Sequence, residues 1–203
     1  MENAAKALQM AAGVLLSLMI VGIIVYTYNN ISSVKQTEQS ARATEAAADF
    51  NMKYEAYNRK GLYGSEILSL ANLIVDYNEK EAENKGYEKI KIEIKSKEKI
   101  TWSGDNSVKF EKTYTDGKAL YNDYEKISKK IKELGKEKID GKTIAQWYKE
   151  PKDTIGNVTI SKKVNNYDEL IGMQTEFARK TFDCTKVEYG TTGRINLMKF
   201  EEK

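Results

Sequence analysis

The stretch LQMAAGVLLSLMIVGIIVYTY, residues 8–28, runs for 21 positions without a charge, whereas charged residues are frequent in the rest of the chain. At a helical rise of about 1.5 Å per residue, such a stretch spans the roughly 30 Å hydrocarbon core of a bilayer. We therefore predict that residues 1–30 form a short N-terminal tail and a transmembrane helix. The residues expected to lie in the membrane are Leu8, Leu15, Leu16, Ile20, Ile23, Ile24, Tyr26 and Tyr28, with the two tyrosines at the interface.

A cleaved signal peptide is the competing interpretation of this stretch. Its apolar region is usually about 7 to 15 residues long and is followed closely by small residues at the cleavage site. Here the apolar stretch is longer, and the nearest run of small residues, 41–48, lies among charged residues. The pattern favours a retained single-pass anchor and leaves processing of the N-terminus open.

Charges that flank the apolar stretch do not fix its orientation. Lys6 is offset by Glu2 on the short side, and Lys35 and Arg42 lie near acidic residues on the long side. A long domain crosses the membrane largely regardless of local charge. We therefore expect the protein in the cell membrane with its C-terminal domain outside the cell.

Residues 31–60 are predicted to continue the helix outward as an amphipathic spine, since the first proline is Pro151. One face of this spine carries residues at spacings of 4, 3, 4 and 3, namely Ala43, Ala47, Phe50, Tyr54 and Tyr57. Such a stripe needs a cover, either from the chain's own C-terminal domain or from a second copy. Gly13 and Ser17, four residues apart, would let two membrane helices approach closely, which adds them to the helix-packing candidates.

Residues 61–203 are predicted to form a soluble α+β domain. Gly61 and Gly64 interrupt the helical pattern, and Ser65 is the expected N-cap of a helix over EILSLANLIVDYN. Alternation of Ile90, Ile92 and Ile94 with charged residues predicts a strand with one buried face.

The remaining segments extend this pattern. Apolar residues from Leu120 to Leu134 recur at helical spacing and stop at Gly135, the expected C-terminal cap. NVTISKKV, residues 157–164, is predicted as a short strand and residues 167–180 as a helix. CTKVEY and RINLMKF flank the turn GTTG and predict a C-terminal β-hairpin. The fold class is therefore α+β, in which the long N-terminal helix packs against a small antiparallel sheet with additional helices.

Composition excludes several classes of function. The 33 basic and 30 acidic residues are interleaved, so nucleic acid is not an expected partner. The chain has no histidine and only one cysteine, Cys184, which excludes an intrachain disulfide, a Cys-rich zinc site and histidine-based catalysis. GTTGR lacks the Gly-Lys-Ser/Thr ending of a phosphate loop. We expect no enzyme activity, no metal, no cofactor and no small-molecule substrate.

Several quoted segments occur here in a familiar order: MENAAKAL before the apolar helix, then FNMKYEAYNRKGLYG, SLANLIVDYN and FDCTKVEYGTTGRINLMKF. In this order the chain resembles a group of uncharacterised single-pass membrane proteins of Gram-positive bacteria. A membrane helix that continues as a spine beneath a sheet also looks like the architecture of type IV pilins and pseudopilins. It departs from them in two respects: Gly13 is followed by VLLSL, without the glutamate that pilins carry five residues into the mature chain, and the charged leader of those families is missing.

These observations and the resemblance predict a membrane-anchored, non-enzymatic structural subunit of a cell-envelope filament, secretion or surface complex. Its expected partners are the lipid bilayer and either further copies of itself or other envelope subunits. The alternative is a tethered extracellular binding module for wall polymer or a partner protein. Trp102, Trp147 and the lysines of residues 86–99 would then form the contact surface.

Overall fold

The computed structural model describes residues 2–105 and 107–203, with the side chains of 2–9, 11, 32–34, 36, 37 and 154 outside this description. It divides into two compact units, one ending at Asp49 and the other spanning Phe50–Lys203. Helix α1 (Glu2–Glu55) forms the first unit and contributes its last residues to the second. The second unit combines a mixed five-stranded sheet with further helices, so the fold class is α+β as predicted.

The main sheet has the strand order β1-β8-β9-β2-β5. Its strands are β1 (Leu62–Tyr63), β8 (Thr181–Tyr189), β9 (Ile195–Glu202), β2 (Lys91–Lys95) and β5 (Thr113–Tyr114). Neighbouring strands are antiparallel except for β2 and β9, which run parallel. The predicted antiparallel pairing holds for three of the four strand pairs, and the β2–β9 pair makes the sheet mixed. A parallel pair needs a long crossover, and here the helical segments between β2 and β9 supply it.

The predicted strand around Ile92 and the predicted C-terminal hairpin, which form the centre of this sheet, are both confirmed. Ile90, Ile92 and Ile94 are at most 2% exposed, while Lys91 and Lys95 face solvent. Strands β8 and β9 form the expected C-terminal hairpin, closed by a turn in which Gly193 has a φ of 74°. Two small ladders complete the strands: β3 (Ile100–Thr101) with β4 (Lys109–Phe110), and β6 (Lys138–Ile139) with β7 (Lys142–Thr143).

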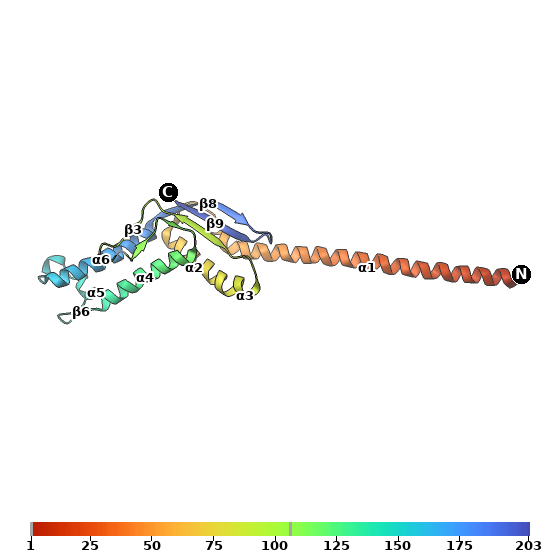
Figure 1. The fold of residues 1–203 in the computed structure, drawn as a ribbon, viewed down its shortest axis with the longest axis horizontal. Coiled ribbons are helices and arrows are strands. Elements are labelled where there is room, and N and C mark those ends of the chain that lie inside the picture. The colour runs from red at the N-terminus through yellow and green to blue at the C-terminus, as the bar shows by residue number, and fades with distance from the viewer. Residues whose placement is uncertain (1, 106) are drawn as a thin grey trace. The chain divides into compact units, whose positions relative to one another are not determined.

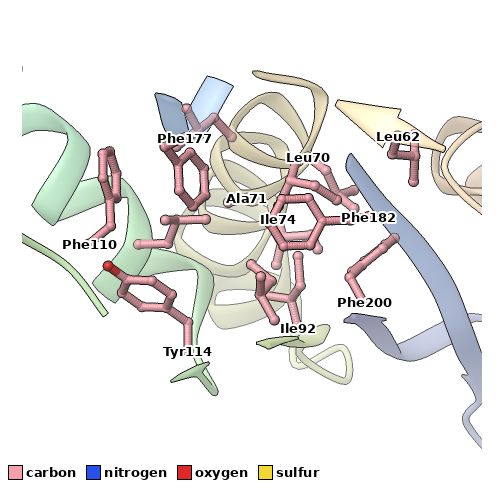
Figure 2. Packing of buried hydrophobic residues seen from close by; sticks show 14 of the residues in the cluster. Leu62, Leu70, Ala71, Ile74, Ile92, Phe110, Tyr114, Phe177, Phe182 and Phe200 are labelled. Atoms are coloured by element: carbon pink, nitrogen blue, oxygen red, sulfur yellow. The ribbon is translucent and has the colours of Figure 1, made fainter. Parts of the chain in front are cut away.

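Among the helices of the second unit, α2 (Gly64–Tyr77) lies in the main core and continues through a π-helical turn, η1 (Asn78–Ala82), into α3 (Glu83–Lys85). The others are α4 (Gly117–Lys136), α5 (Ile144–Trp147), the 3₁₀ turn η2 (Lys152–Thr154) and α6 (Val158–Arg179). Figure 2 shows side chains of the core converging around α2. They include Leu62, Leu70, Ala71, Ile74, Ile92, Phe110, Tyr114, Phe177, Phe182 and Phe200.

Helix α6 begins earlier than predicted, because residues 158–164 are helical and do not form a strand. The Asn157 side chain caps the helix, accepting a hydrogen bond from the Thr159 N–H at 2.9 Å. Ile160 and Val164, four residues apart, then both face a small core beside α5. The β-branched residues of this segment favour a strand, but the Asn157 cap and the burial of Ile160 and Val164 at helical spacing stabilise a helix.

The predicted helix caps Ser65 and Gly135 also need correction. Helix α2 begins at Gly64, so Ser65 is not its N-cap; the Glu66 carboxylate accepts a hydrogen bond from the Tyr63 N–H at 2.9 Å. Helix α4 continues past Gly135 to Lys136. A Cβ at Gly135 would lie 2.9 Å from the Tyr167 ring, so this glycine allows close packing of α4 against α6 and does not end the helix.

Candidate functional site

The first candidate site is an apolar segment of α1, Ala12–Ile31, with a mean hydropathy of 1.8 over its most apolar window. Its 20 residues span about 30 Å as a helix, the thickness of a hydrocarbon core. None of the residues in this most apolar stretch is buried inside the protein. Side chains predicted to face lipid are all exposed here, namely Leu15, Leu16, Ile20, Ile23, Ile24, Tyr26 and Tyr28. This helix is long and apolar enough to cross a membrane.

Leu8, also predicted to face lipid, lies before this segment, and its side chain is outside the described part of the chain. Two hydroxyl groups within the segment bond to the helix itself. The Ser17 hydroxyl donates to the Val14 carbonyl at 2.8 Å, and the Thr27 hydroxyl donates to the Ile23 carbonyl at 2.7 Å. These bonds lower the cost of placing hydroxyl groups in lipid. A Cβ at Gly13 would meet no atom within 4 Å, so the surface around this glycine is open.

The predicted helix-packing stripe is divided between the two units. Ala43 and Ala47 belong to the first unit, where Ala43 is exposed and Ala47 is only 6% exposed, and the aromatic members belong to the second. Tyr54 is 2% exposed in the main core, and Phe50 and Tyr57 pack against that core. The chain's own domain therefore covers the aromatic part of the stripe, and of its two alanines only Ala43 is exposed for contact with a second copy.

Arg194, which the sequence analysis did not single out, packs against aromatic rings of this cluster. The Arg194 guanidinium carbon lies 4.9 Å from the centre of the Phe50 ring and 4.3 Å from that of Tyr87, both within cation–π range. The Phe50 ring in turn lies 4.9 Å from the Tyr77 ring. Burial raises the pKa of Tyr77, while a hydrogen bond from Arg194 opposes that shift. Burial also raises the pKa of Tyr54, so both phenols stay neutral at physiological pH.

Asn51 is the second contact that the sequence did not reveal. Its side chain is 8% exposed; the amide nitrogen donates to the Gly193 carbonyl and the amide oxygen accepts from the Ile195 N–H, both at 2.8 Å. Asn51 thus binds the end of α1 to the β8–β9 turn. One signal was present, because Asn51 lies three residues before Tyr54 and so shares its buried helix face.

We expect Asn51→Ala to lower the free energy of unfolding of the C-terminal unit by about 2–4 kcal/mol, because two backbone groups lose their partner. Chemical denaturation of the full chain in detergent, followed by tryptophan fluorescence, measures this loss. Asn58→Ala is the matched control, since Asn58 is exposed just beyond α1 and should change stability by less than about 0.5 kcal/mol. Equal effects of the two substitutions would contradict the role given to Asn51.

The lysines of residues 86–99 lie on a balanced charged surface. Lys95 lies 3.2 Å from the Glu201 carboxylate, and Lys99 lies 3.7 Å from the Glu111 carboxylate. Trp102 is only 7% exposed, and the Trp147 indole N–H donates to the Ile139 carbonyl at 2.9 Å. Both tryptophans take part in packing, so this surface offers little support for the binding-module alternative.

Two further kinds of site are a reactive thiol and a group of side chains that could bind a metal ion. Cys184 is partly buried, and burial raises the pKa of its thiol, which disfavours the nucleophilic thiolate. Among the described residues, no group of three or more His, Cys, Asp or Glu side chains could hold a metal ion.

No protein-family model, curated protein or solved structure matches this chain. Its own geometry defines the candidate role: an apolar helix exposed on all sides, and a folded unit that encloses the aromatic residues at the end of the same helix.

Proposed function

We propose that this protein is a membrane-anchored, non-enzymatic structural subunit with a pilin-like architecture. It acts in a cell-envelope filament, secretion or surface complex, with its C-terminal unit outside the cell. One observation carries the proposal: α1 provides both the exposed apolar segment Ala12–Ile31 and the buried Tyr54 of the folded unit. Both features therefore belong to one helical element of the chain.

Self-packing is supported by the described side chains of residues 10–46 of α1, which are exposed. Exposed apolar side chains in the segment Ala12–Ile31 need lipid or another helix around them, since water would cost roughly 25 cal/mol for each Å² exposed. Gly13 has no neighbour within 4 Å, and Ala43 is exposed farther along the helix. Small residues at such positions let two helix backbones approach closely. We therefore assign the contact between copies to this region of α1.

Disulfide crosslinking in native membranes tests this contact. With Cys184 replaced by serine, Ala43→Cys should give a covalent dimer on mild oxidation, resolved on a non-reducing gel. Glu45→Cys is the matched control, because two residues along a helix turn the side chain by about 200° to the opposite face. We expect the dimer fraction to be severalfold larger for Ala43→Cys than for Glu45→Cys.

Two results would argue against the proposed self-packing. If Ala43→Cys stays monomeric, no second copy lies against this face. If both variants crosslink equally, the dimers reflect random collision in the membrane. Either result leaves the anchor in place but removes the evidence for a multi-copy assembly through α1.

A further inference from the structure

The outer surface of α2, α4 and α6 carries a groove whose side chains differ from the rest of the protein. Nine of the ten residues that line it are uncharged, although 31% of the whole chain is Asp, Glu, Lys or Arg. The single charged residue is Arg179, in the last turn of α6. A groove lined mainly by hydroxyl and amide groups is unusual on a surface otherwise covered by ion pairs.

Each helix presents one row of side chains to this groove. Ser65, Ser69 and Asn72 follow one another along a face of α2, and Leu68 forms an apolar patch beside them. Tyr121 and Tyr124, three residues apart, contribute two phenol rings from the same face of α4. The groove thus combines aromatic faces, a small apolar patch and a row of polar groups.

Most of these polar groups are available to a ligand. Within residues 2–105 and 107–203, the side chains of Asn72, Tyr121, Tyr124, Thr175 and Arg179 make no hydrogen bond or ion pair. The Gln174 amide nitrogen donates to the Ser128 hydroxyl at 2.8 Å, which leaves its oxygen free to accept. Several donors and acceptors therefore face one groove without partners.

We propose that this groove binds a sugar unit that carries a carboxylate. A pyranose ring offers an apolar face to Tyr121 and Tyr124 and hydroxyl groups to Asn72 and Thr175, and its carboxylate pairs with the Arg179 guanidinium. A polyphosphate would need more than one cation, and a partner helix would need a mainly apolar lining. The site goes beyond the structural role proposed above and does not depend on it.

The full chain in detergent micelles, titrated by NMR, tests this site with two matched pairs of sugars. N-acetylmuramic acid is compared with N-acetylglucosamine, and glucuronic acid with glucose, because the members of each pair differ at the carboxylate-bearing group. We expect saturable shifts in which the acidic sugar binds about tenfold more tightly than its neutral counterpart. The more strongly bound acid identifies whether an acetamido sugar or a uronic acid is preferred.

Three variants complete the test. Arg179→Gln should remove the preference for the acid while keeping the weaker binding of the neutral sugar. Tyr121→Ala should weaken binding of both, and Lys129→Gln, at an exposed position of α4 outside the groove, should change neither. The proposal is overturned if no acid binds better than its neutral partner, or if Arg179→Gln and Lys129→Gln behave alike. Crosslinking through Ala43 is unaffected by either outcome, so the two proposals fail separately.

Discussion

Replacing Leu16 and Ile20 together by arginine will move the protein out of the membrane fraction. Both side chains lie in the apolar segment Ala12–Ile31 and are more than half exposed, so no part of the protein would shield the new charges. Insertion scales assign about 2.5–3.5 kcal/mol to an arginine at the centre of a membrane helix, so the pair costs roughly 5–7 kcal/mol. Sedimentation of membranes after an alkaline carbonate wash, followed by immunoblotting, measures the shift.

The control for this experiment keeps the segment apolar. Leu16→Ala with Ile20→Ala shortens the same two side chains without adding charge and should leave the protein in the pellet. A second control, Glu45→Arg, adds a basic residue outside the apolar segment. If the double arginine variant remains in the carbonate-washed pellet at the level of these controls, α1 is not the membrane anchor.

Gly64→Ala will destabilise the C-terminal unit more than an alanine substitution usually does. A Cβ at Gly64 would lie 1.9 Å from the Phe177 carbonyl oxygen, an atom of the backbone that cannot rotate away. The Gly64 N–H also donates to the Lys180 carbonyl at 2.8 Å, so the clash would break a contact that joins α2 to the end of α6. We expect a loss of at least about 3 kcal/mol in the free energy of unfolding.

Gly172→Ala is expected to raise the free energy of unfolding of the same unit. Gly172 lies inside α6, and a Cβ there would meet no atom within 4 Å. Alanine is the better helix former, so this variant should gain about 0.5–1 kcal/mol. Urea denaturation of both variants, followed by circular dichroism, compares them directly. A Gly64→Ala protein as stable as Gly172→Ala would show that α2 and α6 do not approach as closely as described.

Sequence patterns predicted those elements whose signals are local. The alternation of Ile90, Ile92 and Ile94 identified β2, and the turn GTTG identified the C-terminal hairpin. Each of these signals lies within about ten residues, the range over which periodicity and turn chemistry act. The apolar segment of α1 was predicted equally well, because its amino-acid composition alone makes it more stable in lipid than in water.

Contacts between distant segments were not predictable in the same way. The parallel pairing of β2 with β9 depends on the crossover through the intervening helices, which no local pattern encodes. Gly135 resembled a helix cap, and only the neighbouring Tyr167 ring shows that it serves close packing. At the candidate site the aromatic stripe was predicted, but the contacts of Asn51 and Arg194 join residues more than a hundred positions apart.

The position of β9 in the middle of the sheet has a consequence for synthesis. Both neighbours of β9, β8 and β2, remain without this partner until residue 202 has left the ribosome. About 170 residues separate Ile31 from Glu202, so at typical elongation rates of about 5–20 residues per second the apolar segment emerges some 9–34 s earlier. In the anchored role proposed above, this segment would therefore reach the membrane while the residues behind it are still an unfolded polypeptide, the state in which a chain can be threaded through a narrow channel.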